Sequence, residues 1–416
     1  MRFLLLVLLT YLPLSVLAQD SLHLNRQQAD SLFLRNNLLL LAERFRINAG
    51  QAQIIQASLI DNPTVSVELS SFNNQTRRVL DVGRQGQKTF AVQQLLYTAG
   101  KRNKRIALAA EAAQLTQYEL LDLLRSLRFE LRSRFYAVFF QQQTIARFDQ
   151  QITILQTTID AYEKEYNRNN VSLRELVRLK ALLFQIENDR TEILLQVTDD
   201  QRTLRTLLGI EQPVFPIVRG DALIRYVLPT LTDDTLRAIA LRARPDLLAT
   251  QSLSRQAELN LNLQRALARP DIRVGAAYDQ AGSYIQHYVG LNIATDIPLF
   301  NRNQGAIVAA RSQVSYQQQI QRQKAIQISN EVSTSLQKVR EVDRRVRSVE
   351  GRFTEQFDQL NQGVVISFRK GNISLLEFVD LIESYNQSIR ELNRLKADRV
   401  GAYEELNYLI GEDLFK

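Results

Sequence analysis

Two short segments that lie 202 positions apart carry the charged residues whose spacing suggests a specific chemistry. The first is Asn170-Val-Ser-Leu173 followed by Glu175, and the second is Asn372-Ile-Ser-Leu375 followed by Glu377. In both, a serine precedes a glutamate by three residues. This is the spacing of a capping box, in which the two side chains satisfy each other's backbone N–H groups at the start of a helix. A helix is therefore predicted to begin at each serine.

Two further residues near these segments are not explained by capping. Asp380 lies one helical turn beyond Glu377, and the equivalent position after the first segment holds Arg178. Asn170 and Gly371 stand where a residue in the left-handed conformation commonly ends a helix. Each segment is therefore predicted to be a tight turn between two helices, with opposite charges one turn into the helices that follow.

The composition argues against enzymatic and metal-binding chemistry. The only histidines are His23 and His287, cysteine is absent, and the single methionine is Met1, so no cluster of soft metal ligands can form. No phosphate-binding glycine loop, nucleophile elbow or histidine beside an acid and a serine occurs. The net charge of +8 is dispersed, without a basic run interleaved with aromatic residues. We expect no catalytic residue, no metal site, no cofactor and no nucleic-acid partner.

Long helices must position the two segments. From Lys101 to Leu208 the chain has neither glycine nor proline. Apolar residues recur there at seven-residue intervals, at Leu131, Val138, Ile145, Ile152, Ile159 and Tyr166. Such a repeat keeps one seam against a partner helix only in a coiled coil. We expect one coiled-coil hairpin at 101–209, with Arg190 and Asp200 as exceptions to the apolar pattern of its second arm, and another at 303–411.

The same order of elements occurs twice: a helix, two alternating strands, a long helix, a turn and a last helix. The single helices before the strands are predicted at 24–60 and 232–267. The strands are predicted at about 63–71 and 88–96, then at about 270–279 and 288–297. The whole chain divides into a first repeat at 19–211, a connector at 212–231 and a second repeat at 232–416.

The first residues are typical of an export signal. Met1-Arg2 is basic, Leu4 to Leu17 is almost wholly apolar, and Ala18 offers the small residue that signal peptidase needs. We expect a cleaved signal peptide at 1–18. The alternative, a retained anchor, is disfavoured because a spanning helix needs roughly 17–25 apolar residues. Without cysteine, lipidation of a mature N-terminal cysteine is excluded.

The four strands have the length and alternation of tilted membrane strands. Four are too few to close a barrel, since the smallest bacterial barrels need about eight strands. An open sheet edge in lipid leaves backbone groups unpaired. We therefore expect a fold that is mostly α with membrane β, in which a homotrimer forms a 12-stranded β-barrel continued by an α-helical barrel.

The doubled architecture resembles the TolC-type outer-membrane efflux factors. The likeness rests on the order of elements, the Asn62-Pro63 and Arg269-Pro270 junctions, Asp296-Ile-Pro-Leu-Phe300, Gly100-Lys-Arg102 and the Ser-Leu-x-Glu segments. It is closest to the outer-membrane components of tripartite resistance–nodulation–division pumps, including the heavy-metal branch. The resemblance implies a duct in the outer membrane that extends into the periplasm, with a periplasmic adaptor and an inner-membrane transporter as partners.

The resemblance also implies roles for individual residues. In the family, acidic residues one turn apart near the tip line the pore constriction, and Glu377 and Asp380 match these positions. A ring of Asp380 residues facing Arg178 would hold the end of the duct closed. Glu175 occupies the position equivalent to Glu377. The residues at the tips that would contact the adaptor are Asn169, Asn170, Val171, Ser172, Leu173, Lys370, Gly371, Asn372, Ile373, Ser374 and Leu375.

Some alternatives remain open at the level of the sequence. The duct could belong to a type I protein secretion system instead of an efflux pump, or the chain could be a structural coiled-coil protein of the periplasm. The latter would not need paired alternating strands. Tyr97 and Phe300, at the ends of strands, could form part of an aromatic girdle at the membrane interface or pack at the strand-to-helix corner; corner packing is favoured.

Overall fold

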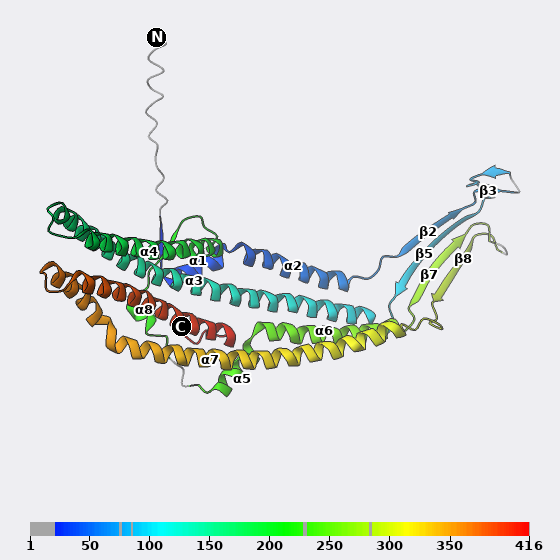
Figure 1. The fold of residues 1–416 in the computed structure, drawn as a ribbon. Coiled ribbons are helices and arrows are strands. Elements are labelled where there is room, and N and C mark those ends of the chain that lie inside the picture. Colours follow the sequence, from blue (N-terminus) through cyan, green and yellow to red (C-terminus); the bar gives the residue numbers. More distant parts are fainter. Residues whose placement is uncertain (1–20, 75–76, 85, 228–230, 283–284, 416) are drawn as a thin grey trace, which may run out of the picture. The chain divides into compact units, whose positions relative to one another are not determined.

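A computed structural model of the chain describes residues 21–74, 77–84, 86–227, 231–282 and 285–415. The signal peptide predicted at 1–18 lies outside these residues. The chain folds into two compact units, and their helices and strands are labelled in Figure 1. The hairpin unit comprises residues up to Leu41, Leu123–Ala243 and Ile328–Lys416, and the sheet unit comprises Ala42–Asp122 and Arg244–Gln327.

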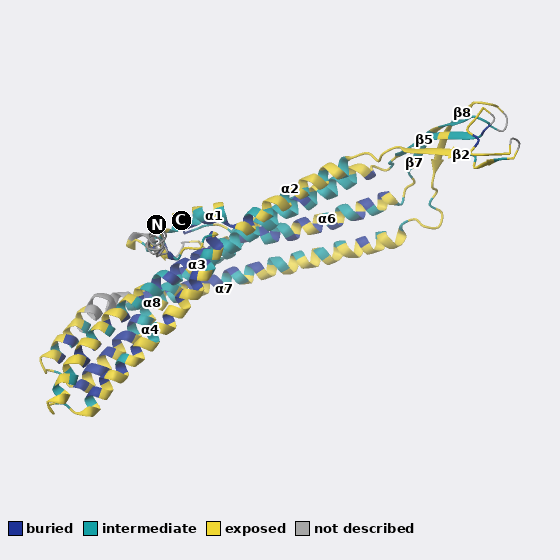
Figure 2. Cartoon of the chain, turned by 90° about the horizontal axis from the view of Figure 1, so that it is seen from above, coloured by how far each residue is buried: buried dark blue, intermediate teal, exposed yellow. Residues whose placement is uncertain are grey.

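The hairpin unit contains the turns of two long helical hairpins. The first is formed by α3 (Lys101–Asn167) and α4 (Leu173–Leu208), and the second by α7 (Gln304–Arg369) and α8 (Leu375–Ile410). The first parts of α3 and α7 belong to the sheet unit. Buried residues line the inner faces of the hairpins, as the dark blue patches of Figure 2 show. They include Leu131, Val138 and Ile159 of the predicted seven-residue seam, whereas Tyr166 at its end is exposed.

Smaller elements complete the hairpin unit. They are β1 (Leu22–Leu24), α1 (Arg26–Asn36), β6 (Val214–Pro216), a 3₁₀ turn (Gly220–Leu223) and α5 (Asp233–Ala243). Strands β1 and β6 pair in parallel, with Leu22 opposite Val214. Part of the predicted connector therefore forms a strand against the N-terminal segment. No helix in the described part of the chain is both long enough and apolar enough to cross a membrane.

The prediction of one continuous helix before each pair of strands is wrong, because each of these helices is divided into two. The first splits into α1 and α2 (Leu38–Ser58) at Asn37, which is extended. The Asn37 side chain accepts the Leu40 N–H at 3.0 Å and donates to the Leu207 carbonyl at 2.9 Å, so it holds the break from both sides. The second splits into α5 and α6 (Pro245–Leu267), because a proline disfavours helical conformation in the residue before it.

The sheet unit is built around four strands: β2 (Thr64–Leu69), β5 (Lys88–Leu96), β7 (Ile272–Asp279) and β8 (Tyr288–Thr295). They pair antiparallel in the order β2-β5-β7-β8, so the two halves of the chain meet at the β5–β7 pair. A short ribbon of β3 (Phe72–Asn73) and β4 (Arg78–Val79) lies in the connection between β2 and β5.

Candidate functional site

The four-stranded sheet has one apolar face. Residues directly opposite each other on paired strands point to the same side of a sheet. The register places Val67, Phe90, Tyr278 and Val289 in one row across the four strands. The next row on this face is Val65, Val92, Ala276 and Leu291. Leu291 is 88% exposed and Ile293, which follows it on this face, is 77% exposed, so the described part of the chain does not cover this surface.

The opposite face of the sheet is polar or carries small side chains. Its rows include Thr64, Gln93, Gly275 and Asn292, and then Ser66, Ala91, Ala277 and Gly290. A sheet that is apolar on one side and polar on the other suits a boundary between a nonpolar environment and water. The sequence alternation that predicted the strands therefore also assigned each residue to its face.

Both outer strands of the sheet have an open edge. Among the described residues, β2 pairs with β5 alone and β8 pairs with β7 alone. These two strands are exposed along nearly their whole length (Figure 2). An unpaired edge presents a row of backbone donors and acceptors that favours pairing with another strand.

The two hairpin turns have the same backbone geometry. After α3, Asn169 adopts a positive φ of 61°, and the N–H of Asn170 donates to the Glu165 carbonyl at 2.9 Å. After α7, Gly371 adopts a φ of 74°, and the N–H of Asn372 donates to the Ser367 carbonyl at 2.9 Å. These are Schellman ends. The prediction that Asn170 is the left-handed residue is wrong by one position, because Asn169 is the equivalent of Gly371.

Both predicted capping boxes are present. The Glu175 carboxylate accepts the Ser172 N–H at 2.9 Å, and the Glu377 carboxylate accepts the Ser374 N–H at 2.7 Å. Each serine hydroxyl in turn accepts the N–H of its glutamate at 3.3 Å. The serine backbone and hydroxyl hydrogen bonds lower the pKa of both glutamates. These two carboxylates therefore fix the starts of α4 and α8 in ionised form.

Asp380 and Arg178, unlike the two glutamates, take no part in capping a helix. Both are exposed, and neither has an ion pair within the described chain. The chain does not bring them together, in contrast to the aromatic residues under the turns. There Phe368 stacks on Phe378 at 4.1 Å between ring centroids and on Tyr162 at 5.8 Å. The turns are therefore held by aromatic packing, while Asp380 and Arg178 remain available to other molecules.

Most of the remaining turn residues are exposed. Among the predicted contact residues, Val171 and Ile373 are half-buried and Leu375 is buried, and Leu173 is 56% exposed. The others are exposed: Asn169, Asn170, Ser172, Lys370, Gly371, Asn372 and Ser374. Within the described ranges, no group of three or more His, Cys, Asp or Glu residues could hold a metal ion.

A buried polar cluster in the hairpin unit was not predicted. Arg132 on α3 is 5% exposed and contacts Asp30 at 3.1 Å, Glu404 at 3.2 Å and Asp413 at 2.8 Å. Burial alone would lower the pKa of Arg132, but the surrounding carboxylates outweigh it and raise that pKa. The Tyr226 hydroxyl, from the connector, donates to Glu404 at 2.7 Å. The cluster thus joins the N-terminal helix, the connector and the C-terminal segment to α3, and no local pattern in the sequence marks these distant partners.

Comparisons with known proteins agree with this geometry. The cobalt-zinc-cadmium resistance protein CzcC of Cupriavidus metallidurans is 22% identical over 289 residues, which span 69% of this chain. The match spans 66% of CzcC, just under two thirds of its length. The crystal structure of CusC superposes with a TM-score of 0.75 at 17% identity and covers 93% of this chain and 92% of that chain. The Campylobacter jejuni CmeC outer membrane channel gives 0.75 at 12% identity and covers 93% and 85%.

These solved structures have the same mostly helical fold with few strands. The sequence profile of the outer membrane efflux protein family matches residues 30–210 and 236–412, which together make up most of the chain. The chain is therefore a member of the outer membrane efflux protein family.

Proposed function

We propose that this chain is the outer-membrane duct of a tripartite efflux system, built from three copies that close one 12-stranded β-barrel and continue it as a tube of helices. The observation that carries the proposal is the four-stranded sheet with one exposed apolar face and two open edges. In lipid each unpaired backbone group costs several kcal/mol, so the edges must pair. Three copies supply enough strands, since bacterial barrels need about eight or more.

The polar face of the sheet fits the inside of such a barrel. Ser66, Gln93 and Asn292 lie on it, opposite the apolar face. A lumen lined by small and polar side chains lets hydrated solutes pass without a tight binding site. The proposed activity is passive conduction, and none of the residues of the sheet or the turns is assigned a catalytic role.

The turns of the two hairpins are proposed to form the periplasmic end of the duct. Asp380 and Arg178 would then meet between copies and narrow the opening, with Glu377 and Glu175 beside them. The exposed residues at 169–173 and 370–375 would meet the periplasmic adaptor, which connects the duct to the inner-membrane transporter. Support comes from the exposure of these residues and from the lack of ion pairs at Asp380 and Arg178 within the described chain.

The resemblance to CzcC favours divalent metal ions as the exported cargo. A duct needs no metal cluster of its own for this role, because the transporter that feeds it selects the cargo. A strain without this chain is then expected to lose tolerance to zinc, cobalt or cadmium salts. Unchanged metal tolerance together with loss of a secreted protein would instead indicate type I secretion.

The absence of cysteine makes the barrel directly testable. Asn292→Cys on β8 is combined in turn with Thr64→Cys, Ser66→Cys or Glu68→Cys on β2, all on the polar face. Oxidation in outer-membrane fractions should link copies into a trimer for at least one combination. The matched control is Asn292→Cys with Ala91→Cys, because β5 is an inner strand. If all three combinations give only monomers after oxidation, the proposed barrel is rejected.

A further inference from the structure

Apolar side chains at the surface form a binding site only where other groups enclose them. Phe300, in the loop after β8, is 93% exposed, so the prediction that it packs at the strand-to-helix corner is wrong. Tyr97, at the end of β5, does pack at its corner: its hydroxyl donates to Asp61 at 2.7 Å and the Arg105 guanidinium lies 4.5 Å from its ring. A more enclosed apolar surface lies in the hairpin unit.

This surface is a cavity of about 730 Å³ between α3, α7, α8 and the end of the 3₁₀ turn, which we call the α8 cavity. Apolar side chains of the three helices line it, and they include Phe139, Phe140, Val342, Ile389, Leu392 and Leu395. The rings of Phe139 and Phe140 meet edge to face, with 5.1 Å between their centroids. Cavities of roughly 300–1,000 Å³ with mostly apolar walls between helices commonly bind small organic molecules.

Polar contacts hold the walls of the α8 cavity in place. Asn393, in the wall on α8, donates to the Thr144 hydroxyl on α3 at 2.9 Å. Arg399, also in this wall, donates to Asp343 on α7 at 2.9 Å and to the Tyr226 carbonyl of the connector at 2.6 Å. The cavity is therefore formed before any ligand arrives, and a ligand would have little ordering of the protein to offset.

The charged side chains of the α8 cavity favour an anion. Five of the lining residues are cations and three are acids. Glu341 and Glu391 each pair at 2.7 Å with an arginine three residues further along their own helix. Arg345 on α7, Lys396 on α8 and Asp398 on α8 have no ion pair within the described chain, which leaves two unpaired cations against one unpaired acid.

We propose that the α8 cavity binds a small organic anion, whose apolar body lies against the two phenylalanine rings and the aliphatic wall and whose carboxylate meets Arg345 and Lys396. The forked N–H donors of a guanidinium match the geometry of a carboxylate, and a hydrogen bond between two charged groups is stronger than a neutral one. All parts of the site belong to one chain. It therefore goes beyond passive conduction and does not depend on closure of the barrel.

Two anions and one neutral molecule test the class of ligand. Naphthoate joins a flat aromatic body to one carboxylate, decanoate joins an alkyl chain to the same group, and naphthalenemethanol keeps the aromatic body without the charge. Each is titrated by calorimetry into the protein in lipid nanodiscs, with empty nanodiscs subtracted. At least one anion should bind, and naphthalenemethanol should bind about fivefold more weakly than naphthoate. Decanoate binding would point to a fatty-acid source, and naphthoate binding alone to an aromatic solute.

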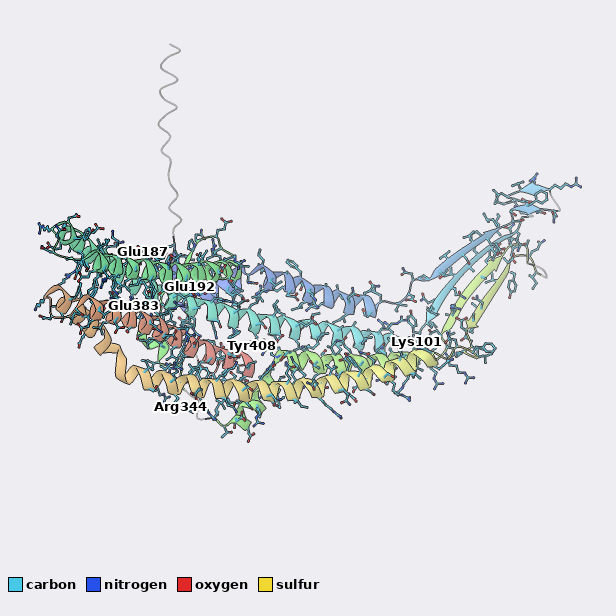
Figure 3. All side chains as sticks on the ribbon, in the orientation of Figure 1. Lys101, Glu187, Glu192, Arg344, Glu383 and Tyr408 are labelled. Atoms are coloured by element: carbon cyan, nitrogen blue, oxygen red, sulfur yellow. The ribbon has the colours of Figure 1, made fainter. Side chains whose placement is uncertain are left out.

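Charge variants should change the affinity for the anion in opposite directions. Arg345→Gln and Lys396→Gln should each weaken it about threefold, whereas Asp398→Asn should strengthen it by a similar factor. Arg344→Gln is the matched control, because Arg344 is the preceding residue on α7, is labelled in Figure 3 and does not line the cavity. This control should bind as the unaltered protein does.

Filling the cavity tests whether the anion binds there. Val342→Phe should abolish binding, and Leu395→Phe in the same cavity replaces it if Val342→Phe does not assemble. Undiminished binding after the cavity is filled would overturn the proposal, as would no binding of either anion to the unaltered protein. Equal affinity for naphthoate and naphthalenemethanol would also overturn it, because the site would then not select an anion. Weaker binding to Asp398→Asn would contradict the assigned role of the charges.

Discussion

At the scale of the residue, Asp380 is the acidic side chain that we expect to control the closed end. It is exposed, and its repeat equivalent Arg178 is exposed as well. Around the axis of a trimer, three carboxylates repel one another unless cations compensate them. Asp380→Ala should therefore raise the conductance of the trimer in planar bilayers and weaken its cation selectivity, since the fixed negative charge that concentrates cations is lost.

Arg178→Ala is the matched control for this prediction. It should also raise conductance if the two residues attract each other, but it should strengthen cation selectivity because a positive charge is removed. An exposed pair contributes only about 0–1 kcal/mol, so assembly should be unaffected by either change. Normal trimers with the conductance and selectivity of the unaltered protein would show that Asp380 is an ordinary surface residue.

Arg132 is the residue of the hairpin unit whose substitution should lower the free energy of unfolding most. Removing one partner of a buried charged cluster costs about 3–5 kcal/mol, so Arg132→Met should strongly lower the free energy of unfolding. Burial alone would raise the pKa of Asp413, but the hydrogen bond and charge of Arg132, with Arg128 and Arg26, outweigh it and lower that pKa. Denaturant unfolding of the trimer in detergent measures the loss.

The lowered pKa of Asp413 predicts a pH dependence with a defined sign. A carboxyl group with a depressed pKa in the folded state stabilises the fold above its unfolded pKa of 3.8, and this contribution is lost as pH falls through the folded value. Asp413→Asn should therefore remove part of the stability at neutral pH and flatten the fall of stability in acid. If the stability of Asp413→Asn falls in acid as that of the unaltered protein does, a group other than Asp413 causes the fall.

At the scale of the element, each turn depends on one left-handed residue. Gly371 holds a φ of 74° at no steric cost, whereas Asn169 holds the equivalent φ of 61° with a side chain. Gly371→Ala should destabilise the end of α7 by about 1 kcal/mol, and Asn169→Gly should slightly stabilise the end of α3. Hydrogen exchange of the Asn372 amide measures the first effect, and exchange of the Asn170 amide measures the second. If neither amide exchanges at a different rate from that in the unaltered protein, Gly371 and Asn169 are not the residues on which the turns depend.

The elements show where prediction from the sequence succeeds and where it stops. Long helices and capping boxes were predictable because a breaker-free seven-residue repeat and a serine–glutamate spacing are local signals. The break at Asn37 was not predictable, because Asn37 also bonds to Leu207, which is far along the chain. Asp200 interrupts the apolar pattern of α4 for a similar reason: it is buried against Arg134 at 2.8 Å and Gln141 at 3.0 Å on α3.

At the scale of the whole molecule, the pairing of β5 with β7 joins the two halves of the chain into one sheet. The alternation within each strand predicted which residues share a face, but pairing across the halves could not be seen in a local pattern. Closure of the proposed barrel and contact between Asp380 and Arg178 depend on further copies. In the proposed function the functional unit is an assembly, and single residues of one chain acquire their proposed roles only within it.

The sidedness of the sheet leads to a prediction for the assembled protein. Leu291 and Asn292 are neighbours on β8, but they lie on the apolar and the polar face. A lysine in the middle of a lipid-facing surface costs about 2–4 kcal/mol, and the cost recurs in each copy of a trimer. Leu291→Lys should therefore block insertion, whereas Asn292→Lys should insert normally and reduce the passage of cations through the lumen. Fractionation of membranes and the yield of trimers resistant to mild heating measure insertion. If both variants insert equally well, neither face of β8 meets lipid, and the proposed barrel and the duct built on it would both have to be abandoned.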